Sequence, residues 1–493
     1  MREQRATPAG RLAIVGAGVI GLSCAWRAAE AGWAVELVDP APGSGSSWVA
    51  GGMLAPVTEA WPGEEDLLEL GADSLRRWPA FAAELAEAAG RPAGLRTEGT
   101  VVVAAAAGDR AELDDLAGYL AKLDREVDRL TARELRRLEP SIGPDVRGGL
   151  SVPGDLAVDN RVLLAALLAA ADRAGVRFVE AWATRVAADG VQLAAGAERT
   201  GAEWAGAERT GAERAGAGWA GAERAGAGWA GAERTGAERT GAGWAAAERA
   251  GAGWAGADRT GAGSGERGGT GRAELAGGRW IEADAVLIAA GAHSAGLHAG
   301  LDGLVRPVKG EILRLRHRVG ALPPPSRTVR AVVDGRPVYA VPRDGGGLVI
   351  GATQYETGFD TEPTVGGVRD LLRDAERVLP GVAEYALVEA AAGLRPGTPD
   401  NLPLIGSLAG GPPGSGAVAG GPLVATGHGR NGMLLAPITA AAVLAMLSGE
   451  PGPPAVAVAD PARLTRAALG PATPTDPAAS ADPAALTGPT ARR

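Results

Sequence analysis

Residues 11–39 read RLAIVGAGVIGLSCAWRAAEAGWAVELVD, and this stretch decides the fold. Its first apolar run, Leu12–Val15, is typical of a buried strand. The next residues, Val19–Ala31, have the composition of a helix that ends before Gly32. A second apolar run, Ala34–Val38, predicts another strand. The order of strand, glycine-rich turn, helix and strand indicates a β-α-β unit in an α/β protein.

The turn carries three glycines, Gly16, Gly18 and Gly21, in the pattern GxGxxG. The first allows a tight turn, the second lets the backbone approach a pyrophosphate, and the third lets the helix pack on the sheet. The start of the helix faces the phosphates with its partial positive charge. Asp39 ends the second strand, where a carboxylate accepts hydrogen bonds from an adenosine ribose. We therefore predict a dinucleotide site here, and not the secretion signal that the basic segment Met1–Arg5 superficially suggests.

Composition excludes several classes of protein. Of 493 residues, 77 are glycine and 34 are proline, but 46% are hydrophobic, so the chain is not wholly disordered. The net charge of −9 argues against a nucleic-acid binder, and the long apolar runs fall short of the ~20 residues of a membrane span. The single cysteine, Cys24, excludes an intrachain disulfide and a cysteine-ligated metal centre. We expect a cytoplasmic protein with no metal, nucleic-acid or membrane partner.

Much of the excess glycine lies in a repeat. Residues 196–260 consist of thirteen five-residue units such as GAERT and GAGWA. A period of five matches neither a helix face nor a strand face. We expect a flexible loop; the alternative is a stacked repeat with buried tryptophans, which would lack the aliphatic residues that such units bury. The tail after Gly449 is rich in proline and alanine, and we expect it to fray apart from a short helix near residues 461–469.

Periodicity and turn signals predict the other elements. We expect helices over residues 64–89, 109–130, 160–175 and 433–447, and strands over residues 100–105 and 177–180. Residues 184–193 are expected to form one arm of a hairpin, and residues 280–290 a later arm followed by a buried parallel strand.

Two later segments favour FAD over NAD as the dinucleotide. Asp284–Gly291 (DAVLIAAG) is similar to the late strand and glycine turn of flavoproteins that have two dinucleotide-binding domains. Ala425–Gly432 (ATGHGRNG) is a glycine-rich loop that opens the last long helix, and a helix start can stabilise negative charge on a reduced flavin.

Several segments together resemble the glycine oxidases of thiamine biosynthesis, a branch of the D-amino-acid oxidase family of FAD-dependent oxidoreductases. The similarity covers residues 11–195 and about 278–450. The segments that carry it are SSWVAGGMLAP (46–56), RPVKGE (306–311), VYAVPR (338–343), VIGAT (349–353), GLRPGTPDNLP (393–403) and TGHGRNGMLLAP (426–437).

The resemblance implies an α/β (α+β) fold of the two-dinucleotide-binding-domain type, with an antiparallel-sheet substrate domain and a low-complexity insertion. The expected FAD-binding domain is discontinuous and comprises residues 11–90, 155–195, 272–303 and 395–450. The expected substrate-binding domain comprises residues 91–154 and 304–394. Residues 196–271 are the expected disordered insertion, and residues 451–493 the tail.

The resemblance also implies a set of site residues. Arg395 would clamp the substrate carboxylate, beside Tyr339 and with Arg430 near substrate and flavin. The implied cofactor-binding residues, together with the glycines of the motif, are Gly16, Gly18, Val19, Ile20, Gly21, Asp39, Pro40, Ser46, Ser47, Gly51, Gly52, Met53, Gly291, His428, Gly429, Arg430, Asn431, Gly432, Met433 and Leu434.

Some of these side chains have purely structural alternatives. Tyr339 could be a core aromatic residue, and Met53 could pack beside a flavin without a role. For His428 we favour a satisfied loop histidine over an acid or base. Lys309 could promote the reaction of a flavin with oxygen or form an ion pair with Glu311 or another acid.

The implied activity is FAD-dependent oxidative deamination of glycine. An arginine fork holds the carboxylate by two charge-assisted bonds. The flavin then takes the hydride, and no protein nucleophile is needed. The expected products are an imine or glyoxylate, ammonia and hydrogen peroxide, with oxygen as the acceptor. The imine would feed the thiazole-synthesis machinery, and family members often assemble as tetramers.

Two other functions remain open on the sequence. One is a related enzyme, a D-amino-acid dehydrogenase or a sarcosine oxidase. The other is a non-catalytic flavoprotein module whose repeat recruits a partner. Some related amine oxidases bind flavin through a late cysteine; Cys24 lies far from that position, in the first helix, so we expect non-covalent FAD.

Overall fold

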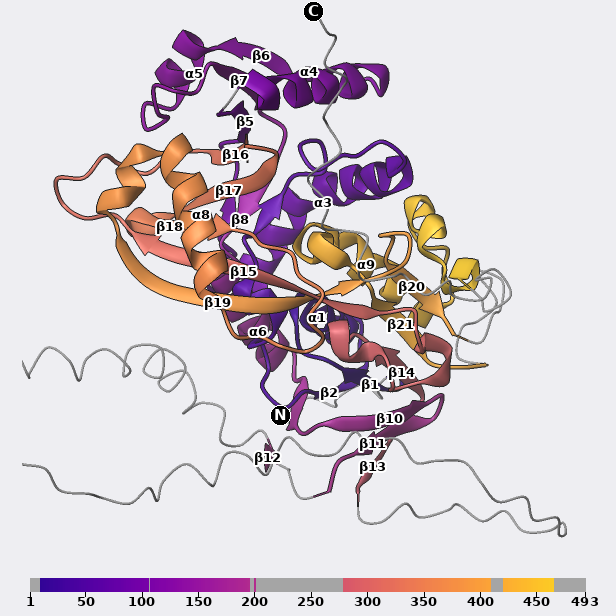
Figure 1. The fold of residues 1–493 in the computed structure, drawn as a ribbon. Coiled ribbons are helices and arrows are strands. Elements are labelled where there is room, and N and C mark those ends of the chain that lie inside the picture. Colours follow the sequence, from indigo (N-terminus) through magenta and orange to yellow (C-terminus); the bar gives the residue numbers. More distant parts are fainter. Residues whose placement is uncertain (1–8, 106, 196–198, 201–277, 409–419, 465–493) are drawn as a thin grey trace, which may run out of the picture. The chain divides into compact units, whose positions relative to one another are not determined.

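The computed structural model describes residues 9–105, 107–195, 199–200, 278–408 and 420–464 (Figure 1). All of them belong to one compact unit formed by residues 1–201 and 278–493. Of the short tail helix expected near residues 461–469, Pro461–Leu464 forms a 3-10 turn and the remainder lies outside the described residues. Another 3-10 turn, Pro454–Ala459, precedes it. Most of the predicted insertion, and the tail after Leu464, lie outside the described residues.

The first sheet has seven strands in the order β12-β9-β2-β1-β14-β21-β20. Its central strands are parallel, as β-α-β connections require, whereas β12 and β20 pair antiparallel at the two edges. The strands are β1 (Arg11–Val15), β2 (Ala34–Val38), β9 (Arg177–Glu180), β12 (Arg199–Thr200), β14 (Ala285–Ile288), β20 (Leu404–Ser407) and β21 (Leu423–Thr426).

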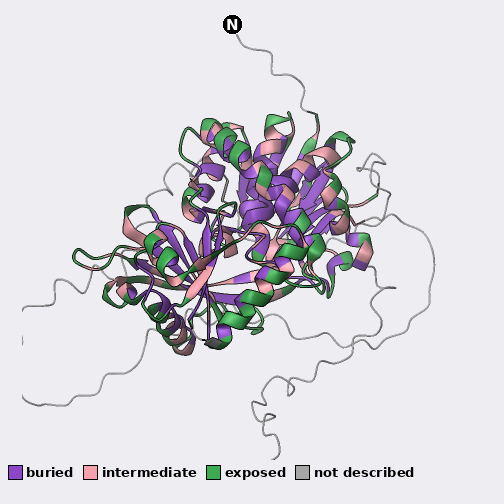
Figure 2. Ribbon diagram, turned by 90° about the horizontal axis from the view of Figure 1, so that it is seen from above, coloured by how far each residue is buried: buried purple, intermediate pink, exposed green. Residues whose placement is uncertain are grey.

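Helices and a small sheet contribute to the hydrophobic clusters around this sheet. The helices are α1 (Val19–Glu30), α3 (Glu65–Ala89), α6 (Asn160–Arg173) and α9 (Gly432–Ser448), and their buried residues form one cluster with β1 and β2. A second cluster joins the sheet to a three-stranded antiparallel sheet of β10 (Ala183–Ala187), β11 (Gly190–Leu193) and β13 (Trp280–Glu282). Figure 2 shows the buried residues concentrated in the strands and the exposed ones along the outer faces of the helices.

The second large sheet has eight strands in the order β19-β15-β18-β17-β16-β5-β7-β6, antiparallel except where β16 meets β5. A cluster of buried aliphatic residues joins it to α8 (Val365–Val378) and α5 (Ala132–Leu138). The strands are β5 (Thr100–Ala104), β6 (Asp128–Thr131), β7 (Gly148–Val152), β15 (Arg306–Arg316), β16 (Thr328–Val333), β17 (Arg336–Arg343), β18 (Gly347–Gly351) and β19 (Ala386–Gly397).

Two elements differ from the sequence-based expectation. The helix expected over residues 109–130 is α4 (Ala107–Lys122), and it ends early because Asp124 takes a left-handed conformation (φ 57°) and residues 128–131 pair with β7 instead. The single arm expected over residues 184–193 is itself a hairpin of β10 and β11, which turns at Ala188 and Asp189.

The insertion interrupts a strand pair. β11 pairs directly with β13, with Val191 opposite Ile281, although about ninety residues separate them in sequence. Within the predicted insertion, Arg199 and Thr200 form the edge strand β12 rather than loop.

One described segment, Gly429–Ser448, is long and apolar enough to cross a membrane by length and composition. The test window within it is 67% buried inside the protein. Its helix, α9, packs against α1 and α3, which is the environment of a core helix.

Candidate functional site

The GxGxxG turn has the geometry that its glycines predict. Gly16 has a φ of 104°, and its N–H donates to the carbonyl of Val38 at 2.8 Å. A Cβ on Gly21 would overlap the carbonyl oxygen of Gly16, so only glycine lets the helix start this close to the turn. Helix α1 begins at Val19, and its N-cap residue, Gly18, has no side chain to cap it, so the positive end of the helix dipole faces the turn.

The segment of residues 46–53, called the 46–53 loop below, lies against this helix start. It contains α2 (Ser46–Val49) and leads into β3 (Met53–Leu54). The hydroxyl of Ser47 accepts a hydrogen bond from the N–H of Val19 at 3.0 Å. The hydroxyl of Ser46 donates to the carbonyl of Leu394, one residue before Arg395. The loop therefore connects the dinucleotide turn to strand β19.

Asp39 lies at the carboxyl end of β2, as expected for a ribose-binding acid. Its Oδ2 accepts from the N–H of Ala17 at 2.7 Å and its Oδ1 from the N–H of Ala41 at 2.8 Å. Burial raises the pKa of Asp39, and these backbone donors and the nearby His293 oppose the rise. His293 stacks on Phe359 with ring centroids 4.9 Å apart, so it supports the loop after Gly291.

Arg395 and Tyr339 lie on one face of the eight-stranded sheet. Strand register puts Arg330, Tyr339 and Gly351 side by side on β16, β17 and β18. Gly351 is also opposite Ile312 of β15, and Val308 of the same strand is opposite Arg395. Because alternate residues of a strand share a face, all of these side chains point the same way.

Glycines make room for both side chains on that face. A Cβ on Gly310 would overlap the guanidinium of Arg395, and one on Gly351 would overlap the phenol of Tyr339. Gly51 of the 46–53 loop approaches from the other side, and a Cβ there would lie 2.7 Å from the Tyr339 hydroxyl. The structure thus brings the predicted carboxylate clamp and the predicted flavin loop together. Burial raises the pKa of Tyr339, so its phenol is a neutral hydrogen-bond donor.

Arg395 is partly buried and has no carboxylate partner among the described residues. Its Nη1 donates to the carbonyl of Thr353 at 3.2 Å and lies 3.5 Å from the carbonyl of Lys309. A guanidinium that is not paired with an acid and lies beside a buried phenol is suited to an anionic ligand.

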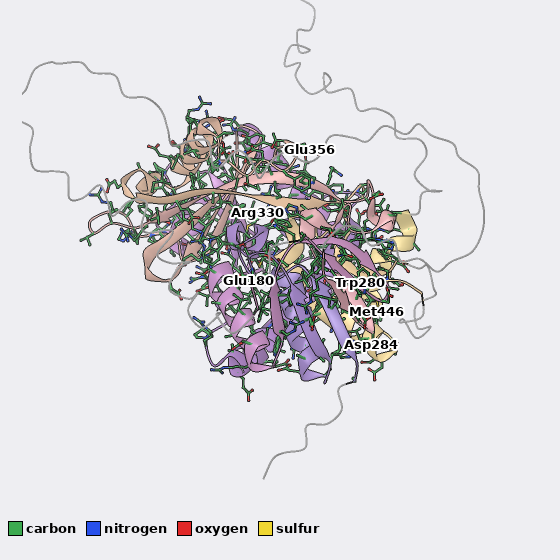
Figure 3. The ribbon with its side chains drawn as sticks, turned by 90° about the horizontal axis from the view of Figure 1, so that it is seen from below. Glu180, Trp280, Asp284, Arg330, Glu356 and Met446 are labelled. Carbon is green, nitrogen blue, oxygen red and sulfur yellow. The ribbon has the colours of Figure 1, made fainter. Side chains whose placement is uncertain are left out.

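Arg430, in contrast, is held by acids. Its Nη2 donates to Glu64 at 2.7 Å, and its Nε lies 3.9 Å from Glu59. Glu59 is also 3.5 Å from Arg330, the cross-strand neighbour of Tyr339. Figure 3 shows Arg330 and Glu356 in the upper half of the view, away from Trp280 and Asp284. Sequence reasoning did not find Glu59 and Arg330, since nothing local in either segment marks the pair.

The loop before α9 is anchored by a buried histidine. His428 Nε2 lies 3.0 Å from the hydroxyl of Thr439, and burial lowers the pKa of His428 to about 3. A neutral, hydrogen-bonded ring agrees with the structural alternative. Gly427 and Gly429 have positive φ values, 73° and 53°, which turn the chain into the start of α9. The carbonyl of Leu434 accepts from Ser74 and Trp78 of α3.

Lys309 forms the ion pair that was one of its two alternatives. Its Nζ lies 3.7 Å from Glu311 and also contacts Asp360 and the carbonyl of Glu362. These contacts raise the pKa of Lys309, and the hydrogen bond to Asp360 has the largest effect. Cys24 is buried in α1, and burial raises the pKa of its thiol to about 12, so it is an unreactive thiol.

Comparison with known proteins identifies the family. The family described as "DAO: FAD dependent oxidoreductase" matches residues 11–224 and 242–446, which is most of the chain. The chain belongs to this family of FAD-dependent oxidoreductases. Its resemblance to the glycine oxidases, and its mixed α/β fold, are confirmed by the same comparisons.

Two relatives and one solved structure show which members of the family this chain is similar to. A glycine oxidase of Geobacillus kaustophilus is 28% identical over 438 residues, covering 87% of this chain and 90% of that protein. A protein of Rhizobium etli named putative thiamine biosynthesis oxidoreductase ThiO is 27% identical over 446 residues, covering 90% and 98%. The solved structure of the Geobacillus kaustophilus glycine oxidase matches with a TM-score of 0.67 at 27% identity, covering 93% of this chain and 99% of that one.

The residues at the dinucleotide turn fit an FAD. The glycine turn presents backbone and no side chains of its own to a pyrophosphate, and the group on the first N–H of α1 is the neutral hydroxyl of Ser47 and not a carboxylate. Asp39 lies at the carboxyl end of β2, and both of its oxygens accept from backbone N–H groups beside the turn. The 46–53 loop leads from the turn to the face that carries Arg395 and Tyr339. The individual contacts of the predicted cofactor residues stay predictions.

Proposed function

We propose that this protein catalyses the FAD-dependent oxidative deamination of glycine. The observation that carries the proposal is Arg395, a guanidinium without a carboxylate partner among the described residues, placed beside Tyr339 and next to the 46–53 loop. The similarity to glycine oxidases over nearly the whole chain supports the choice of substrate.

In this proposal Arg395 binds the substrate carboxylate through two parallel hydrogen bonds. The neutral phenol of Tyr339 donates a third bond to the same carboxylate. Together they fix the Cα–H of the amino acid toward the cofactor, and such orientation supplies a large share of the rate. A bound FAD would supply the redox chemistry, a two-electron oxidation of the amino acid with oxygen as the final acceptor and hydrogen peroxide as its product. The imine product hydrolyses to glyoxylate and ammonia, or is passed on intact.

Further features of the proposal follow the relatives. The similarity to a protein named as a thiamine biosynthesis oxidoreductase supports a role in supplying the imine for thiazole synthesis. FAD is bound non-covalently, because the one cysteine is buried in α1 as an unreactive thiol. The enzyme works in the cytoplasm and assembles as a homo-oligomer, a tetramer on the resemblance.

Anaerobic mixing with glycine tests the proposal. Glycine should bleach the visible absorption of the bound flavin, and readmitted oxygen should restore it with release of peroxide. Sarcosine and D-alanine are measured at the same concentrations. If D-alanine or sarcosine bleaches the flavin faster than glycine does, glycine is not the preferred substrate, and the protein is one of the related enzymes instead. Absence of bleaching by all three in an FAD-loaded protein would favour the non-catalytic module.

A further inference from the structure

A buried polar cluster lies behind the 46–53 loop, on the side of the eight-stranded sheet. Its centre is Asn160, the first residue of α6, whose side chain is fully buried. Asn160 does not cap its helix, because the neighbouring Asp159 does so by accepting from the N–H groups of Arg161 and Val162. The amide of Asn160 is therefore free for other partners.

Asn160 holds two main-chain carbonyls of the loop. Its Nδ2 donates to the carbonyl of Ser47 and to that of Trp48, each at 2.8 Å. Its Oδ1 accepts from Arg314 at 3.1 Å and from Arg343 at 3.3 Å. Both hydrogens and the oxygen of this amide are in use, so the side chain is fixed in one orientation.

The same two arginines also bind the loop directly. Arg343 donates to the carbonyl of Gly51 at 2.6 Å, and Arg314 donates to the carbonyl of Trp48 at 3.3 Å. Three carbonyls of the loop thus accept hydrogen bonds from the cluster. Arg314 and Arg343 come from β15 and β17, the strands that also carry Gly310 and Tyr339.

Burying the charged groups of this cluster costs folding free energy, so stability alone does not explain them. Arg161, stacked on Trp48 at 4.2 Å, pairs with Glu389, and Arg343 lies 3.5 Å from Asp159. Among the described residues the cluster therefore sets three guanidinium groups against two carboxylates. Burial and the neighbouring arginines lower the pKa of Arg314 to about 10. Apolar side chains in such a position would usually stabilise a fold at least as well.

We propose that Asn160, Arg314 and Arg343 are positioning residues that preorganise the 46–53 loop for the cofactor and keep it in register with the substrate sheet. They act through the loop's carbonyls and do not touch the substrate. The excess positive charge behind the loop also favours an anionic group on its other side. This inference rests on the FAD of the family and not on the choice of glycine as substrate.

The test is the affinity of the full-length apoprotein for FAD, measured by quenching of flavin fluorescence without any amino acid present. Asn160→Ala removes both donors, and Asn160→Asp keeps the acceptor for the two arginines but removes the donors. Because both variants lose two hydrogen bonds to the loop, we expect the Kd for FAD to rise roughly tenfold to a hundredfold in each. The flavin absorption spectrum and midpoint potential should shift as well.

Arg336→Met is the matched control. Arg336 lies on the same strand as Arg343 but makes its two bonds to Asp374 of α8, at 2.8 and 2.9 Å. This variant should lower the Tm of apoprotein and holoprotein equally and leave the Kd for FAD unchanged. If Asn160→Ala yields no folded apoprotein, Arg314→Lys is measured in its place. The proposal is overturned if the cluster variants behave as the control does, with a lower Tm and a Kd within twofold of the parent.

Discussion

Replacement of Arg395 by alanine should weaken glycine turnover without removing FAD. The guanidinium lies on β19, and its hydrogen bonds to described residues go to main-chain carbonyls and not to an acid. A carboxylate bound by the fork would lose two charge-assisted bonds, each worth about 1.5–3 kcal/mol. Because Arg395 is only partly buried, water can replace part of the lost hydrogen bonding. We therefore take the lower limit for the two bonds together, about 3 kcal/mol. At 1.4 kcal/mol per tenfold, kcat/KM for glycine should fall roughly a hundredfold or more.

A second substitution probes the same clamp from its neighbour. A Cβ on Gly310 would overlap the far end of the Arg395 side chain and not backbone, so Gly310→Ala should fold while it displaces the guanidinium. Arg395→Lys keeps the positive charge but not the two parallel donors of the guanidinium. Its kcat/KM for glycine should therefore lie between those of the parent and Arg395→Ala. Arg306→Ala is the control, because Arg306 lies on the adjacent strand β15 and pairs with Glu356 at 3.2 Å.

Peroxide release with glycine, coupled to a peroxidase, gives KM and kcat for each variant. FAD content and Tm are recorded alongside, so that a folding defect is not read as a binding defect. The reasoning is refuted if Arg395→Ala and Gly310→Ala keep full FAD content and a kcat/KM for glycine within twofold of the parent. A loss in Arg306→Ala as large as that in Arg395→Ala would also refute it, since the effect would then not depend on the unpaired guanidinium.

Three further predictions concern the cofactor turn, a buried acid and the insertion. Gly21→Ala should abolish FAD binding in a fluorescence titration, because its Cβ overlaps the backbone of Gly16, whereas Gly118→Ala in α4, with open space around it, should leave Kd and Tm unchanged or raise Tm slightly. Burial raises the pKa of Asp155 to about 7, against ~3.9 in an unfolded chain, so its contribution to stability is complete below pH ~4 and is lost as pH rises through 7. Asp155→Asn should therefore show a smaller fall in Tm between pH 5 and 8 than the parent, and equal falls would contradict this. Replacement of residues 196–277 by a short turn should preserve FAD content and Tm, because β11 and β13 already pair as a hairpin; loss of FAD binding would show that the insertion is needed.

The dinucleotide turn could be predicted from sequence because its signals are local. Gly16, Gly18 and Gly21 each satisfy a steric need that lies within a few residues, and the flanking strand and helix are strongly patterned. The start of α9 after Gly427 and Gly429 was predictable for the same reason. Element ends were harder, since the early stop of α4 depends on β6 finding β7 as a partner.

Contacts between distant segments could not be predicted in the same way. Asn160 and Arg314 are 154 residues apart, and Arg330 is 272 residues from its partner Thr58. Each contact depends on the register of strands in the eight-stranded sheet, which the sequence does not show. Asn160 in particular occurs at a helix start, where an asparagine is ordinarily interpreted as a cap. The structure shows that Asp159 caps the helix instead, which leaves the amide of Asn160 free to bind the 46–53 loop.

The two faces of the eight-stranded sheet carry different kinds of side chain, and Arg395 lies on the more polar face. The other face is packed with aliphatic side chains such as Leu313 and Ile350. This one includes Val308 and Ile312 but also carries glycines, at positions 310 and 351, together with arginines and a tyrosine. Glycine in a strand gives up both packing and stability, and buried guanidinium groups add a desolvation cost. A face that gives up stability in both ways is shaped for contact with something other than its own core. The 46–53 loop supplies one such contact. The guanidinium of Arg395, which has no carboxylate partner in the described part of the chain, is left for a ligand.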